Sequence, residues 1–268
     1  MTFAETVAAA VKEFAERGFT SEEQLAEWMM RLRQAAAATF TPRAEMERML
    51  REALRSVYDR LVERAGILKM HPGVSRFTLA NVKPHLRAEL DRRIMASASL
   101  IKLNRDETIE LTLRRFAGWA TSIPAGGTPE AKRAPAEDVK KALRQLPFRE
   151  RRVLIDQGHK LNASISAVLA QDSGAIAAIW HSHWRQANYQ YRPDHKTRDG
   201  KVYLMRDSWA HRAGLVKRGD VGYFDEVTQP AEEPFCRCFV TYLLHLRQLP
   251  DDMLTAKGRL ALNTARSA

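Results

Sequence analysis

Apolar side chains recur every three or four residues through most of the first 120 positions, the spacing that places them on one face of an α-helix. In the first helix, expected over residues 2–17, Phe3, Val7 and Phe14 follow this spacing, and Gly18 ends it. The same pattern predicts four further helices in this half. One follows a capping box at Thr20-Ser21-Glu22-Glu23, and the others cover residues 42–64, 83–103 and 104–119, the last opened by a second capping box at Asn104-Arg105-Asp106-Glu107.

Two stretches interrupt the helical pattern. Residues 76–78 have the composition of a short extended segment. Residues 121–135 contain three prolines and two glycines, the residues that most often break regular structure. The second stretch therefore predicts a linker, and a short helix over residues 136–145 is expected between it and Pro147.

Beyond Pro147 the pattern predicts one long helix, over residues 148–170, and then short β-prone segments. At Asp172-Ser173-Gly174 the helix is expected either to kink or to give way to another that reaches Ser182. Asp199-Gly200 is a turn dipeptide, at which Gly200 is expected to adopt a positive φ. The expected strands lie within residues 184–191, 201–205 and 239–243.

These patterns predict an α+β fold, with a predominantly helical N-terminal region and then a small α+β module with a short, mainly antiparallel sheet. The expected division is a helical region (1–120), a linker and short helix (121–147), an α+β module (148–248) and a C-terminal tail (249–268).

The length and composition suit one large domain or two smaller ones, since 45% of the 268 residues are hydrophobic, enough for a real core. No apolar run approaches the roughly 20 residues that cross a bilayer. The N-terminus lacks a basic segment followed by an apolar one, so we expect neither a signal peptide nor a membrane partner.

The charge is strongly basic, with 43 Lys and Arg against 32 Asp and Glu and a net charge of +11. Such an excess favours a polyanionic partner, nucleic acid first and an anionic membrane or an acidic protein second. Positive charge is densest between Lys140 and Lys160, where an exposed helical face is an alternative to a phosphate-binding one. The candidate nucleic-acid-binding residues are Lys140, Lys141, Arg144, Arg149, Arg151 and Arg152.

Three motif segments stand out in the second half: Arg192-Pro193-Asp194-His195, Asp199-Gly200-Lys201 and Pro234-Phe235-Cys236-Arg237-Cys238. In their order and spacing they resemble the phage Mu F-like minor head proteins, also called phage head morphogenesis proteins. The resemblance covers roughly residues 148–244. Its motif residues are Arg192, His195, Asp199, Gly200, Lys201, Cys236, Arg237 and Cys238.

The resemblance implies a phage structural protein, present in few copies inside the procapsid or virion and assembled in the bacterial host cytoplasm. Its implied partners are the portal protein or capsid and scaffold subunits, together with DNA. One feature departs from the family pattern. Many members carry an extra Cys-x-x-Cys before the His and Gly-Lys motifs, which this chain lacks, so a four-cysteine metal cluster is excluded.

Cys236 and Cys238 are the two cysteines of the chain, and two readings of them stay open. On a strand, both sulfurs of a Cys-x-Cys pair point to one face, so His195, Cys236 and Cys238 can form part of a zinc site. We favour the other reading, in which the thiols pack as small apolar side chains, His195 bonds to backbone, and no cofactor is bound.

We expect no enzymatic activity, because the chain contains neither Gly-x-Ser-x-Gly nor His-Glu-x-x-His nor a phosphate-binding glycine-rich loop. The rival hypothesis is a nuclease or toxin-like enzyme that cleaves RNA or DNA, with His195, His183 and Lys201 as catalytic residues. Domains resembling this one occur in bacterial toxin-like polyproteins, which supports the rival by analogy alone.

Overall fold

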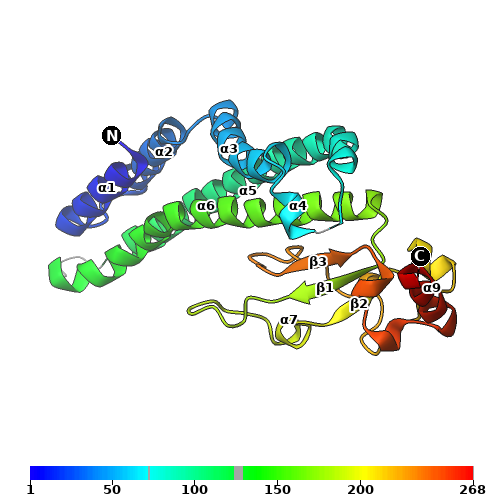
Figure 1. The fold of residues 1–268 in the computed structure, drawn as a ribbon. Coiled ribbons are helices and arrows are strands. Elements are labelled where there is room, and N and C mark those ends of the chain that lie inside the picture. Colours follow the sequence, from blue (N-terminus) through cyan, green and yellow to red (C-terminus); the bar gives the residue numbers. More distant parts are fainter. Residues whose placement is uncertain (72, 124–128, 268) are drawn as a thin grey trace. The chain divides into compact units, whose positions relative to one another are not determined.

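A computed structural model describes residues 1–71, 73–123 and 129–267, and confirms the α+β class (Figure 1). The chain divides into two compact units. The first comprises Met1–Met49 and Ala96–Val153, and the second Leu50–Met95 and Leu154–Ala268. This division differs from the one expected from sequence, because two long helices each contribute residues to both units.

The first unit buries its apolar residues against α1 (Phe3–Arg17) and α2 (Glu22–Thr39). The predicted first helix is confirmed, with Thr2 capping its N-terminus. Phe14 meets Phe116 edge to face, with ring centroids 5.3 Å apart, in the middle of this core. The cap of α2 is Ser21 rather than Thr20, since the Ser21 hydroxyl accepts the backbone N–H of Gln24.

The third predicted helix appears as α3 (Arg43–Tyr58) followed by a π-helical turn, η1 (Asp59–Glu63). A short helix, α4 (Ile67–Met70), comes next.

The next helix, α5 (Arg76–Ser122), replaces three predicted elements. Residues 76–78, expected to be extended, begin this helix, because the Ser75 hydroxyl accepts the backbone N–H of Thr78 at 3.0 Å as an N-cap does. The two helices expected on either side of Asn104 are one. Ile101 and Leu113 lie on either side of the capping box, and both are buried. This burial outweighs the local capping signal, so the helix continues through it.

The helix α6 (Pro129–Asp172) begins inside the predicted linker and covers its second half. Of residues 121–135, positions 124–128 lie outside the described residues, while the stretch from 129 onward is helical. The break expected at Pro147 is also absent from α6. Burial of Leu146 and Val153 on either side of this proline offsets the loss of one backbone hydrogen bond.

The sheet of the second unit is antiparallel, in the order β2-β1-β3. Strands β2 (Val202–Leu204) and β3 (Phe239–Leu243) confirm two predictions. The central strand β1 (Ala177–His181) lies where a helix was expected, so that prediction is wrong, and residues 184–191, expected to be a strand, form none in the described structure. An alanine-rich apolar run has no clear period, and here both of its faces are buried.

Alternate residues of β1 face two different cores. Ala178 and Trp180 pack with both cysteines on one side of the sheet, whereas Ala177 packs with Leu204 and Leu243 on the other. The remaining elements are short: α7 (Pro193–Thr197), α8 (Trp209–Arg212), η2 (Phe224–Glu226), η3 (Leu246–Gln248), η4 (Asp251–Met253) and the C-terminal α9 (Ala256–Ser267). Among the described residues, no helix has the length and apolarity to span a membrane.

Candidate metal centre

His195, Cys236 and Cys238 form one buried group of possible metal ligands. The Nδ1 atom of His195 lies 3.6 Å from the Sγ of Cys236 and 3.5 Å from the Sγ of Cys238. The three donor atoms all lie within 4.8 Å of one another. The histidine comes from α7 and the two cysteines from the loop that leads into β3, so the predicted position of the cysteines on the last strand is wrong by a few residues.

The histidine is held by the turn that follows α7. Gly200 has a φ of 75°, as predicted, and donates its N–H to the carbonyl of Trp180 in β1 at 2.8 Å. The Asp199 carboxylate accepts the backbone N–H of Ser182 at 2.8 Å and the indole N–H of Trp184 at 2.9 Å, and these hydrogen bonds lower its pKa. Asp199 and Gly200 thus tie α7 to the end of β1.

The cysteine loop is tied to two other elements. The backbone N–H of Phe235 donates to the carboxylate of Asp156 on α6 at 2.6 Å. Phe235 has a φ of 60°, a conformation that is unfavourable for a bulky residue and therefore depends on such contacts. Arg192 forms an ion pair with Glu233 and donates to the Pro234 carbonyl at 3.1 Å, which joins the start of α7 to this loop.

The second nitrogen of His195 faces carboxylates. Its Nε2 lies 3.6 Å from a Glu233 oxygen and 3.7 Å from an Asp194 oxygen. Within the described part of the chain, Nε2 is buried without a hydrogen-bond partner, whereas this Glu233 oxygen also takes the ion pair from Arg192. A metal-binding histidine usually donates its other ring N–H to a carboxylate, which fixes the tautomer that leaves the first nitrogen free to bind the metal. Here Nε2 faces the carboxylates, and Nδ1 is the nitrogen left to bind.

The two thiols differ in acidity. A hydrogen bond from Cys238 lowers the pKa of Cys236 to about 5, and the same interaction raises the pKa of Cys238. This lowering favours the thiolate form of Cys236. Thiolate is the form of cysteine that binds metal ions.

The separations match the edges of a tetrahedral site. With zinc bonds of about 2.0–2.1 Å to nitrogen and 2.3 Å to sulfur, a tetrahedron places N and S about 3.6 Å apart. The expectation that the thiols are buried with apolar neighbours is met, but His195 turns its Nδ1 toward the sulfurs instead of the backbone. The two N–S distances are thus compatible with a shared metal ion.

The proposed catalytic residues do not gather in this group. The His195 side chain is only 2% exposed, Lys201 is exposed, and His183 lines a cavity that Cys238 also lines. Asp156 and Glu233, which support the site, were not identified from sequence. In the sequence each looks like an ordinary surface acid, because the contacts that join it to this site, from Phe235 to Asp156 and from Arg192 to Glu233, span long stretches of the chain.

The predicted nucleic-acid-binding residues lie on α6. Lys141, Arg144, Arg151 and Arg152 are exposed, whereas Lys140 and Arg149 are partly buried. The charge of this face is partly compensated, since both Lys140 and Arg144 pair with Glu137.

No protein-family model, curated protein or solved structure matches this chain. The likeness to the phage Mu F-like minor head proteins therefore rests on the motif residues themselves.

Proposed function

We propose that this chain is a phage minor head protein, a non-enzymatic component present in few copies in the procapsid or virion. It binds portal or capsid subunits, and its basic α6 face contacts DNA. The proposal is supported by the way the motif residues contact one another. Arg192 holds the cysteine loop, His195 faces both thiols, and Asp199 fixes the adjoining turn.

A motif whose members stabilise one module is expected of a protein that acts by binding. Burial of the His195 side chain argues against the nuclease alternative. A general acid or base must come within hydrogen-bond reach of its substrate, and a phosphodiester does not reach a side chain this deeply covered.

Quantitative mass spectrometry of particles tests the head-protein role. Procapsids and mature virions of the phage or prophage that encodes the chain are purified, with portal and major capsid proteins as internal standards of copy number. A few copies per particle are expected. Absence from both particle types would discard the proposal and make a nuclease assay on His195→Ala the next experiment.

We further propose that His195, Cys236 and Cys238 hold a zinc ion that stabilises the module. The N–S separations of 3.5 and 3.6 Å favour it, as does the preference of thiolate and imidazole ligands for this metal. Elemental analysis of protein purified without chelator is expected to find one zinc per chain.

A further inference from the structure

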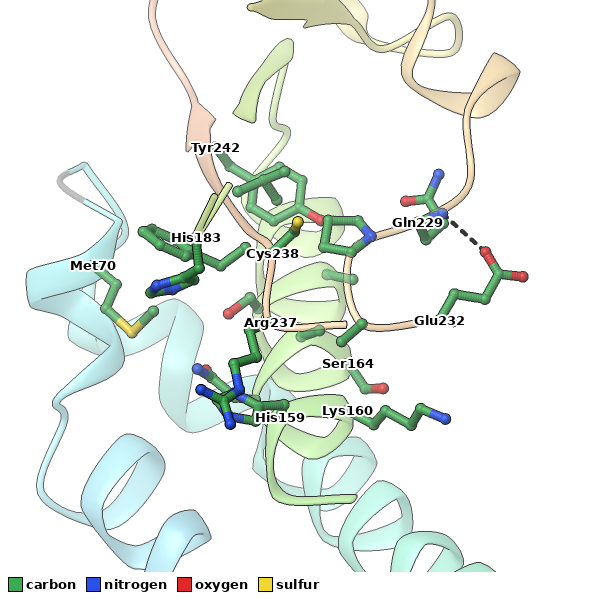
Figure 2. Close-up of a pocket in the computed structure, with 18 of the residues that line it drawn as sticks. Met70, His159, Lys160, Ser164, His183, Gln229, Glu232, Arg237, Cys238 and Tyr242 are labelled. Atoms are coloured by element: carbon green, nitrogen blue, oxygen red, sulfur yellow. Dashed lines mark hydrogen bonds between the residues drawn. The ribbon is translucent and has the colours of Figure 1, made fainter. Parts of the chain in front are cut away.

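A cavity of about 460 Å³ lies in the second unit, beside α6 and the loop that leads into β3 (Figure 2). This volume falls within the range of sites for small molecules. The basic residues that line it are Arg93, His159, Lys160, His183 and Arg237. Among its described lining residues the one acid is Glu232, so the lining is predominantly positive.

Two of these cations are compensated by neighbouring acids. Arg93 pairs with Glu89 at 2.9 Å, and Lys160 pairs with Asp156 at 3.0 Å. Arg237 differs, because no described carboxylate lies within ion-pair distance of it. Its guanidinium instead donates to the side-chain oxygen of Gln186 at 3.1 Å and lies 5.2 Å from the ring centroid of Tyr189.

Arg237 extends toward His159 at the wall of the cavity, and Figure 2 shows the two side chains next to each other. Burial lowers the pKa of His159, and the nearby Arg237 and His183 lower it further, whereas the Asp156 carboxylate acts in the opposite direction. The only acid acting on His159 in this region, within the described residues, is Asp156, which already pairs with Lys160. The remaining basic character of the wall attracts an anion.

Hydrogen-bonding groups of α6 continue this wall. Ser164, Ser166 and Asn162 line the cavity. Hydroxyl and amide groups supply the additional donors that a multiply charged oxyanion needs. Met70, Phe239 and Tyr242 form an apolar part of the lining that suits the organic portion of a ligand.

We propose that this cavity binds a phosphate monoester, with the phosphate group at Arg237 and His159. The planar fork of a guanidinium matches two oxygens of a phosphate, and the predominantly basic lining favours a dianion. A cavity of this size admits a small phosphorylated molecule or the phosphorylated end of a nucleic-acid strand, but not a duplex. The inference is independent of the proposed role in the phage head.

Calorimetric titration of the full chain with inorganic phosphate and with adenosine monophosphate tests the site. The wild type is expected to bind, and Arg237→Gln to bind at least tenfold more weakly. Arg247→Gln is the matched control, because Arg247 is exposed and is not a lining residue. Thermal melting of each variant shows whether it remains folded, and His159→Gln replaces Arg237→Gln if the latter does not fold.

Single-stranded oligonucleotides with and without a 5′-phosphate separate the two sources of the monoester. Preference for the phosphorylated strand that is lost in Arg237→Gln identifies a nucleic-acid end, whereas binding of adenosine monophosphate without that preference identifies a small molecule. The proposal is overturned if the wild type binds none of these probes, or if folded Arg237→Gln and His159→Gln bind them as the wild type does.

Discussion

His195 and Cys238 stand 43 positions apart in the sequence, yet the Nδ1 of the histidine lies 3.5 Å from the sulfur of the cysteine. This contact joins α7 to the loop before β3. It also places a nitrogen donor at the spacing from sulfur that a tetrahedral metal ion requires. The first prediction follows from this pair and its neighbour Cys236.

Cys236→Ser is expected to abolish zinc binding and to destabilise the second unit, because it removes one of three buried ligands. A loss of about 3 kcal/mol lowers Tm by roughly 6–12 °C in a protein of this size. Chelator added to the wild type should have the same effect. Metal content and melting curves measure both outcomes. His85→Gln, at an exposed histidine on α5, should keep its metal, and a wild type free of zinc would contradict the prediction.

Gly200→Val is expected to lower the free energy of unfolding by about 1–2 kcal/mol, because valine there must adopt the left-handed backbone conformation. A Cβ built at this position meets nothing within 4 Å, so the cost is one of backbone conformation and not of crowding. Urea unfolding measures the loss. Gly200→Asn should lose much less, since asparagine tolerates a positive φ, and equal losses for the two variants would refute the explanation.

Asp156→Ala is expected to destabilise the protein by about 3 kcal/mol, because it leaves a lysine and a backbone N–H without their partner. The Asp156 side chain is 6% exposed and that of Lys160 is 15% exposed, so water compensates neither group fully. Asp156→Asn retains an oxygen that can accept from Phe235 and should lose less. Urea unfolding of the two variants checks this order, and a neutral Asp156→Ala would exclude the proposed anchoring of the cysteine loop.

His71 is expected to make the protein less stable in acid. Its side chain is buried, its Nδ1 lies 3.5 Å from the backbone N of Tyr242, and burial lowers its pKa to about 4. The unfolded chain takes up this proton near pH 6.5, so the contribution of His71 is complete above about pH 6.5 and is lost as pH falls toward 4. At about 1.4 kcal/mol per pKa unit, the loss approaches 3 kcal/mol.

Unfolding free energies of the wild type and His71→Gln across this pH range test the assignment. The variant should show a weaker dependence on pH, since other histidines still titrate in it. An identical dependence in both proteins would remove His71 from the explanation.

DNA binding through α6 is expected to weaken steeply with salt, because phosphate contacts release counterions. Lys141→Gln should reduce the salt dependence by about one contact, whereas Lys12→Gln on α1 should leave it unchanged. Both lysines are exposed. Fluorescence anisotropy of labelled DNA over a salt series measures the slopes, and binding that persists unchanged into high salt would contradict an electrostatic interface.

The sequence by itself determined the features that depend on neighbours a few positions away. The face of α1 follows from a three- and four-residue period, and the turn at Gly200 follows from a dipeptide that permits positive φ. Strands β2 and β3 were recognisable because each is short, β-prone and bounded by turns. The motif spacing also named His195, Cys236 and Cys238 as one possible ligand set.

The tertiary structure decided the features that depend on distant partners. Capping signals at Asn104 and a proline at 147 predicted helix ends, but burial along α5 and α6 outweighs a cap or a single missing hydrogen bond. The alanine-rich β1 is a strand because both of its edges pair with other strands. The direction of the His195 ring, and the bond from Phe235 to Asp156, likewise depend on groups brought together across the fold, and no pattern along the chain records such distances.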